Sequence, residues 1–242
     1  MSIISQIRRR IQSTSEIIPN VYQLIARGTN VILIVEKELT LIDTGIRGNS
    51  PQLVDFIRHL GRSPEEISLI ILTHNHIDHM GGLAELKQLT SAKVAIHKAD
   101  IGKRENLPSA YSRYRLPLNQ LSSTLLSAFS VKFSDIDIQL EDGDVLKPLG
   151  GLEIIHTPGH TQGSISLFSR QNKLLIVGDA LRKHRKTIHL PPKMAGSNPT
   201  QALASVKRIA QLDFGILCFG HGLPLSDDVH TKLQDLIERT KD

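Results

Sequence analysis

The chain has 242 residues, 40% of them hydrophobic and 22% charged, which is the composition of a globular protein long enough to bury a core within one domain. The net charge of +5 suggests nucleic acid as one possible binding partner. With no Trp, three Tyr and six Phe, however, the chain has few rings on which unpaired bases could stack, which disfavours that partner. Cys218 is the single cysteine, which excludes an intrachain disulfide, and we expect a cytoplasmic protein.

The apolar segments are too short to cross a membrane. The longest aliphatic runs, residues 31–35 and 69–72, have the length of strands, so we expect no transmembrane segment. In the basic segment 1–16 the positive charges follow the apolar residues, which is the reverse of a secretory signal. Its isoleucines have helical spacing, so organellar targeting or membrane-surface binding stays open, although we favour a short helix packed on the domain.

The first half of the chain predicts a β-meander followed by alternating helices and strands. The expected strands are residues 21–25, 30–35, 39–42, 68–72 and 93–97, and the expected helices are residues 51–60 and 82–89. Pro51 suits the first turn of a helix, and Gly61 suits its end. Residues 101–130 are expected to form a partly helical excursion that could act as a lid.

The second half returns to short strands separated by Gly, Asp and Asn turns. The expected strands are residues 136–140, 152–155, 164–168, 173–177 and 216–219, and the expected helices are residues 199–212 and 227–239. Two strand-rich halves that both carry helices predict an α/β fold, an αββα sandwich with two mixed β-sheets face to face and helices on both outer faces. We expect one domain over residues 1–242.

The segment 73–82 holds three imidazoles and one carboxylate within six positions, directly after an apolar strand. A strand sends alternate side chains to one side, so His74 and His76 can face one metal ion, and a turn beyond them lets Asp78 and His79 reach another. A single histidine would be interpreted as an ordinary polar loop residue. A cluster of this density predicts metal binding.

Three more ligand-type residues stand beside glycine at the ends of predicted strands. They are His160, Asp179 and His221. Glycine lets the backbone turn tightly and brings a side chain close to a crowded centre. Taken alone, each of the three would be interpreted as an ordinary turn residue.

Taken in order, these motifs resemble those of the metallo-β-lactamase superfamily of metal-dependent hydrolases. The likeness runs from about residue 17 to residue 225 and includes the His-x-His-x-Asp-His motif and the later Gly-His, Gly-Asp and Gly-His pairs. Segments 42–45 and 157–164 are typical of its hydroxyacylglutathione-hydrolase-like and lactonase-like branches. The resemblance implies that His74, His76 and His160 hold one metal ion, that Asp78, His79 and His221 hold a second, and that Asp179 bridges the two.

A binuclear site of this kind implies two divalent metal ions and no protein nucleophile. Nitrogen and carboxylate donors without thiolate suit zinc, and manganese or iron would also be accepted. Two such ions would supply a hydroxide that could attack the substrate, and Asp78 and Asp179 are the carboxylates expected to act in catalysis. Asp43 is expected either to orient a ligand or only to cap the turn in which it lies.

The zinc β-lactamases of the superfamily commonly have Cys or Ser where this chain has Asp179, so antibiotic hydrolysis is disfavoured. We expect cleavage of a small ester, lactone or thioester, because a thiolate or alkoxide leaves without strong acid help. Basic residues in segments 182–186 and 101–130 could attract an anionic substrate, although a solvated charged surface explains them equally well. The candidate substrate contacts are Tyr111, Tyr114, Arg182, His184 and His189.

Three other functions stay open at this point. A phosphodiesterase or ribonuclease of the same superfamily is supported by the basic charge but not by any long insertion that could grip nucleic acid. A mono-iron enzyme similar to persulfide dioxygenases would use one metal ion only. A non-catalytic metal-binding protein is the least favoured, because the set of expected ligands is complete.

Overall fold

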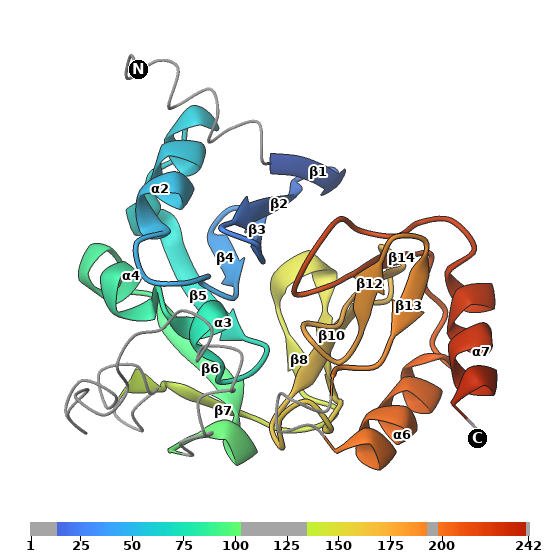
Figure 1. Ribbon diagram of the computed structural model, residues 1–242. Coiled ribbons are helices and arrows are strands. Elements are labelled where there is room, and N and C mark those ends of the chain that lie inside the picture. Colours follow the sequence, from blue (N-terminus) through green and yellow to red (C-terminus); the bar gives the residue numbers. More distant parts are fainter. Residues whose placement is uncertain (1–13, 103–134, 193–197, 241–242) are drawn as a thin grey trace, which may run out of the picture.

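A computed structural model describes residues 14–102, 135–192 and 198–240 of the chain, in which two β-sheets lie face to face between helices (Figure 1). Two predicted features fall largely outside these residues. The basic segment 1–16 is described only from Thr14, where the first strand begins. The excursion 101–130 is described only at its first two residues, so Tyr111 and Tyr114 lie outside the described part.

The first sheet has the strand order β1-β2-β3-β4-β5-β6-β7. Its strands are β1 (Thr14–Ile18), β2 (Val21–Ala26), β3 (Thr29–Val35), β4 (Leu39–Ile42), β5 (Ile67–Leu72), β6 (Lys93–His97) and β7 (Ile138–Leu140). Strands β1 to β4 form an antiparallel meander, and β4 to β7 run parallel. The apolar sequence of β5 fits its position between two parallel neighbours, because a parallel strand is covered on both faces.

The second sheet has the order β14-β11-β10-β9-β8. Its strands are β8 (Val145–Leu146), β9 (Leu152–His156), β10 (Ile165–Ser169), β11 (Leu174–Ile176) and β14 (Ile216–Cys218). Only the pair β11–β14 is parallel. A separate antiparallel hairpin, β12 (Arg182–His184) with β13 (Thr187–His189), follows β11 in the chain.

Helices cover the outer face of each sheet (Figure 1). Helices α2 (Ser50–His59) and α4 (Leu83–Leu89) lie on the first sheet, α6 (Pro199–Ile209) and α7 (Val229–Arg239) lie on the second, and α3 (Ile77–Met80) is a single turn after β5. Short 3-10 turns span Pro64–Glu66, Lys98–Asp100 and Pro148–Gly150. In α2, Leu53, Phe56 and Ile57 share one buried face, and Gly61 has the positive φ of +74° that follows the helix end.

The hydrophobic core is divided into three layers, as an αββα sandwich requires. Ile71 and Leu167 belong to the layer between the two sheets. Phe56 belongs to the layer between the first sheet and its helices, and Val206 and Leu233 belong to the layer on the far side of the second sheet. The predicted fold class is therefore confirmed.

The predicted strands and helices that fall within the described residues are present to within a few residues. Five strands and helices were not predicted: β1, β8, the two strands of the β12–β13 hairpin, and α3. The hairpin escapes prediction because residues 182–186 have the pattern of a solvated charge run, and only Ile188 on its second strand is buried. Among the helices of the described segments, none combines the length and the apolarity that crossing a membrane requires.

Candidate metal centre

The loops that leave both sheets at one end bring together all seven candidate ligands predicted from the sequence. The first sheet contributes His74 and His76, which follow β5, and Asp78 and His79, which lie on α3. The second sheet contributes His160 from the β9–β10 loop, Asp179 after β11 and His221 after β14. The cluster therefore lies between the two sheets, and neither sheet could build it alone.

Three histidines form the first group. The ring centroids of His74, His76 and His160 are 4.5 to 4.7 Å apart. One nitrogen from each ring lies within 4.8 Å of the other two. Two donors at about 2.0–2.1 Å from one metal lie no more than about 4.2 Å apart, so three nitrogens this close need only small shifts to converge on one ion.

A second group consists of Asp78, His79 and His221, whose donor atoms again lie within 4.8 Å of one another. Asp78 Oδ2 is 3.4 Å from His221 Nε2 and 3.8 Å from His79 Nε2. This group mixes one carboxylate with two imidazoles. It is a donor set that divalent transition metals accept.

Asp179 lies between the two groups. Its Oδ2 is 3.6 Å from His160 Nε2 and 3.4 Å from His221 Nε2, and its Oδ1 is 3.5 Å from His79 Nε2. One carboxylate thus faces a histidine of the first group with one oxygen and histidines of the second group with both. This is the position that the sequence prediction gave to a bridging residue.

Asp43 determines which nitrogen two of these histidines present. Its Oδ2 lies 2.7 Å from His79 Nδ1 and accepts the Thr73 hydroxyl at 2.8 Å, while its Oδ1 accepts the Thr73 amide at 2.8 Å. Because the Thr73 hydroxyl hydrogen is donated to Asp43, its oxygen accepts from His74 Nδ1, 3.0 Å away. Of the two roles considered for Asp43, the hydrogen bonds support the orienting one.

With Nδ1 protonated, each of these rings presents the Nε2 lone pair to the cluster. The same holds for His221, whose Nδ1 lies 2.8 Å from the carbonyl oxygen of Gly28. The Nε2 atoms of His74 and His79 and the Oδ1 atom of Asp179 are buried without a hydrogen-bond partner. Buried polar atoms are costly to leave unpaired, so these donors fit a divalent cation well.

The electrostatics of the cluster keep its carboxylates ionised. Burial raises the pKa of Asp78, but a hydrogen bond with His221 and the charge of His79 outweigh it and bring the pKa to about 2. For Asp179, burial likewise raises the pKa, but the charges of His79 and His221 and a hydrogen bond with His221 hold it well below its usual range. Ionised carboxylates are the form that binds cations.

The histidines divide according to their neighbours. Burial lowers the pKa of His79, but the negative charges of Asp43 and Asp179 raise it to about 9. Burial also lowers the pKa of His221, but hydrogen bonds to Asp179 and Asp78 raise it to about 11. For His74, burial and the charges of the neighbouring histidines hold the pKa well below the usual value. The second group, rich in carboxylate, therefore already favours positive charge.

The turn 219–222, which carries His221, is fastened to the first sheet. The side chain of Asn30 donates to the carbonyl oxygens of Phe219 (2.8 Å) and Gly222 (2.6 Å). The backbone amide of Asn30 donates to the carbonyl oxygen of Gly220 (2.7 Å). Gln23 donates to the same Gly222 oxygen at 3.0 Å. Sequence reasoning missed both residues, although a polar side chain in an otherwise apolar strand was an available signal.

Gly220 lets this turn approach the cluster. A Cβ atom at this position would overlap Asp179 Oδ1 and would lie 2.7 Å from His79 Cε1. Any residue with a Cβ atom would therefore clash with two candidate ligands, so their packing requires glycine before His221.

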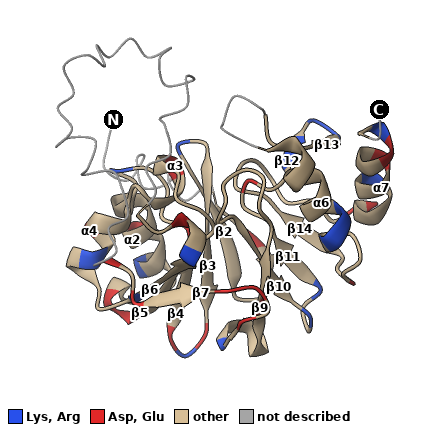
Figure 2. Ribbon diagram, turned by 90° about the horizontal axis from the view of Figure 1, so that it is seen from below, with Lys and Arg blue, Asp and Glu red and all other residues tan. Residues whose placement is uncertain are grey.

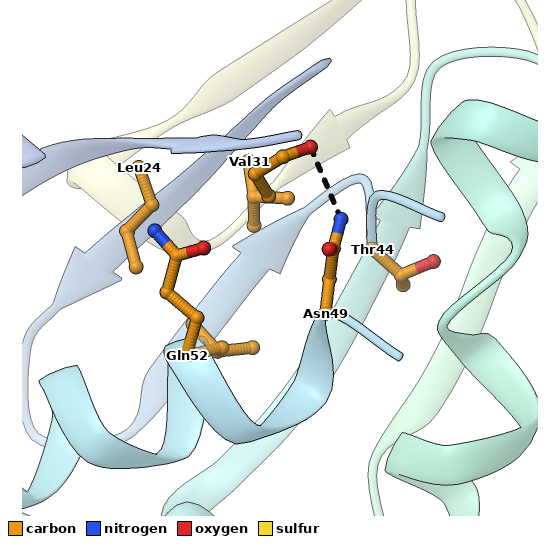
Figure 3. A pocket seen from close by; sticks show the side chains of 7 residues that line it. Leu24, Val31, Thr44, Asn49 and Gln52 are labelled. Carbon is orange, nitrogen blue, oxygen red and sulfur yellow. Dashed lines mark hydrogen bonds between the residues drawn. The ribbon is translucent and has the colours of Figure 1, made fainter. Parts of the chain in front are cut away.

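A small pocket lies between the start of α2 and strands β2 and β3 (Figure 3). Its lining residues are Leu24, Ala26, Val31, Thr44, Asn49, Gln52 and Leu53. Asn49 donates across it to the carbonyl oxygen of Ala26 at 3.1 Å. Thr44 donates its hydroxyl to the backbone oxygen of His79 at 2.9 Å, and so connects this pocket to the helical turn that carries a candidate ligand.

The candidate substrate contacts Arg182, His184 and His189 lie on the β12–β13 hairpin with exposed side chains. Figure 2 shows the basic residues on this hairpin. Lys183, on its first strand, donates to the carbonyl oxygen of Pro224 at 3.0 Å. The hairpin is therefore fastened to the loop that follows His221.

The sequence model of the metallo-beta-lactamase superfamily matches residues 24–221. The chain belongs to this superfamily. The predicted family is thus confirmed, as is the predicted enzyme class of metal-dependent hydrolase.

Among curated relatives, the probable metallo-hydrolase YflN of Bacillus subtilis is 29% identical over 201 residues, which cover 77% of this chain and 76% of the relative. The hydroxyacylglutathione hydrolase GloC of Haemophilus influenzae is 30% identical over 154 residues, which cover 60% of this chain and 62% of the relative.

Among solved structures, a metallo-beta-lactamase family protein of Thermus thermophilus, TTHA1429, is 25% identical with a TM-score of 0.69 and covers 93% of this chain and 80% of its own. The B3 metallo-beta-lactamase BLEG-1 superposes with a TM-score of 0.66 at 22% identity, covering 88% of this chain and 95% of its own. At that identity the likeness to BLEG-1 shows the fold alone.

Proposed function

We propose that this chain is a binuclear hydrolase that cleaves an ester, lactone or thioester of a small anionic substrate. His74, His76 and His160 would hold one divalent ion, Asp78, His79 and His221 would hold the other, and Asp179 would lie between them. The donor set contains no thiolate, so zinc is the ion we expect. The convergence of these seven donors from both sheets carries the proposal.

When bound, two such ions would act as Lewis acids that polarise the substrate carbonyl. They would also lower the pKa of water, so that hydroxide is available as the nucleophile at neutral pH. The protein's own contribution is to fix the donors. Asp43 and Thr73 keep the Nδ1 protons of His79 and His74 engaged, so that both Nε2 atoms stay directed at the cluster. Asp179 sets the spacing of the two groups through its contacts with His160 and His221.

The same donors limit which leaving group can depart. Imidazoles and carboxylates must be unprotonated to act as ligands, so the cluster would retain no acid to protonate a leaving amine. A thiolate or alkoxide needs less help than an amide nitrogen. This supports carbon–sulfur or carbon–oxygen cleavage, and the similarity to a hydroxyacylglutathione hydrolase favours the thioester among these.

The anionic character of the substrate is proposed from the β12–β13 hairpin. Arg182 follows Asp179 by three residues, and its exposed side chain shares the hairpin with Lys183 and Arg185. Positive charge at the border of a site raises the local concentration of anions. Arg182, His184 and His189 are the residues that we propose to contact the substrate.

A substrate panel tests the proposal. Zinc-loaded enzyme is assayed on an acidic thioester, a lactone, a phosphodiester and a single-stranded RNA, and we expect turnover of the carbonyl substrates. Asp179→Ala should abolish this turnover and release metal, whereas Asp213→Ala, which removes an exposed carboxylate paired with Lys173, should do neither. Turnover of the phosphodiester or RNA alone would refute the carbonyl assignment in favour of the nuclease.

A further inference from the structure

A buried carboxylate outside the metal cluster joins two of the loops that form it. Asp100 ends the short turn Lys98–Asp100 after β6, and it is 1% exposed. Its Oδ2 accepts the backbone amide of Asn75 at 3.1 Å and the hydroxyl of Thr161 at 2.7 Å. Its Oδ1 accepts the backbone amide of Gly163 at 2.6 Å.

These partners come from the two loops that carry the three-histidine group. Asn75 stands between His74 and His76 in the sequence, and its side chain also donates to the backbone oxygen of Asp100 at 3.1 Å. Thr161 follows His160 directly. One loop leaves the first sheet and the other joins strands of the second, so Asp100 connects segments whose separation determines whether three nitrogens can converge.

The contact leaves little room for adjustment. A Cβ atom on Gly163 would lie 2.5 Å from Asp100 Cγ, so the loop and the carboxylate touch. On the other side, Thr161 is held by Ser164, whose Oγ accepts the Thr161 amide at 3.0 Å and lies 2.8 Å from its hydroxyl oxygen. Because the Thr161 hydroxyl oxygen accepts from the Ser164 hydroxyl, the Thr161 hydroxyl hydrogen is directed at Asp100.

The chemistry of these contacts requires a carboxylate. All the groups facing the Asp100 oxygens in these contacts are N–H or O–H donors. An amide in place of the carboxylate would set an NH₂ group against at least one of these donors, and the displaced donor would be buried without an acceptor.

We propose that Asp100 is a positioning residue for the three-histidine half of the metal centre: it holds the His74–His76 loop at the distance from the His160 loop that metal binding requires. This inference rests on the proposed function, since it assumes that these three histidines bind an ion. Hydrogen-bonded supports of metal ligands typically change affinity by about 10–100-fold when they are removed.

The test measures metal affinity rather than turnover. Zinc is titrated against a chromophoric chelator in the wild-type chain, in Asp100→Asn and in Asp137→Asn, and cobalt absorption reports the geometry of each site. Asp137 is the control for the chemical change alone, because this exposed residue also accepts a backbone amide at its Oδ2, that of Val94 at 2.8 Å, in a bond that involves neither ligand loop. We expect Asp100→Asn to weaken one zinc site by about 10–100-fold and to alter its cobalt spectrum.

The melting temperature of each metal-free protein separates a general loss of stability from a loss of ligand positioning. If Asp100→Asn does not fold, Thr161→Val decides, because it removes one donor to Asp100 and keeps the shape of the side chain. Wild-type zinc affinity and cobalt spectrum in the folded variants would overturn the positioning role while leaving the proposed function intact. A wild-type chain that binds no divalent ion would overturn both.

Discussion

Replacing Asp43 by Asn should reverse the proton arrangement on which the metal centre depends. In the wild-type chain, Asp43 Oδ2 accepts from His79 Nδ1 and from the Thr73 hydroxyl, which in turn accepts from His74 Nδ1. Asn tolerates the positive φ of +60° at this position, so the turn itself should persist. Its NH₂ group, however, would donate where the carboxylate accepted.

The consequence is a change of tautomer. If the NH₂ group faces His79, Nδ1 becomes an acceptor and the proton moves to Nε2, the atom that should bind metal. The Thr73 hydroxyl, once it accepts from the amide, would donate to His74 Nδ1 and have the same effect on that ring. If the introduced Asn side chain is flipped instead, its NH₂ group faces the backbone N–H of Thr73. In the wild-type chain that N–H donates to Asp43 Oδ1 at 2.8 Å. Neither arrangement preserves the network.

The magnitude follows from the bonds lost. Each is a buried hydrogen bond to a carboxylate, of the kind worth about 1.5–3 kcal/mol. Supports of metal ligands change affinity by about 10–100-fold, which is about 1.4–2.7 kcal/mol. We therefore expect Asp43→Asn to weaken both zinc sites by about that factor, because His74 belongs to one group and His79 to the other.

Chelator competition measures the zinc affinities, and mass spectrometry of the native protein counts the ions. Thr73→Val is the internal control: it should weaken the three-histidine site alone, since His79 keeps its own hydrogen bond to Asp43. Zinc affinities within twofold of wild type in folded Asp43→Asn would refute the tautomer argument.

Three further predictions concern metal removal, the loop of His221 and the basic hairpin. A chelator should lower the melting temperature by about 5–10 °C for each ion that it removes, because one ion at 100 times its Kd adds about 2.7 kcal/mol, worth about 2–4 °C per kcal/mol in a chain of this size; an unchanged melting temperature in scanning fluorimetry would contradict a metal cluster that joins the sheets. Asn30→Ala should weaken the site that contains His221 more than the three-histidine site, as read by zinc titration, and equal weakening would disprove a local effect. Arg182→Glu with Arg185→Glu should raise KM for an acidic thioester and reduce its salt dependence; an unchanged KM would show that these charges do not act on the substrate.

The sequence predicts the centre well where chemistry is concentrated. His74, His76, Asp78 and His79 follow one apolar strand within six positions, and each of the three distant candidates stands beside a glycine at a strand end. Such residues are recognisable without coordinates because their types and their positions relative to strands restrict what they can do. The layered fold follows for the same reason, from the periodicity of buried strands and helices.

What supports the ligands is harder to predict. Asp100 follows Lys98 and Ala99 in a segment with no motif, and only the folded chain shows that its carboxylate reaches Asn75, Thr161 and Gly163. Contacts over such sequence separations depend on how the two sheets are placed, which local patterns do not encode. The β12–β13 hairpin was missed for a different reason, since its buried side is formed by few residues and its exposed side has the composition of a solvated loop.

We expect donors from both sheets to hold a pair of divalent ions. The most direct measurement is the metal content of the purified, active chain, by elemental analysis per mole of protein, with Asp179→Ala analysed beside it. We predict two divalent ions per wild-type chain and a marked loss in the variant. A single iron, no metal, or the same content in both proteins would show that these donors do not hold a pair of ions.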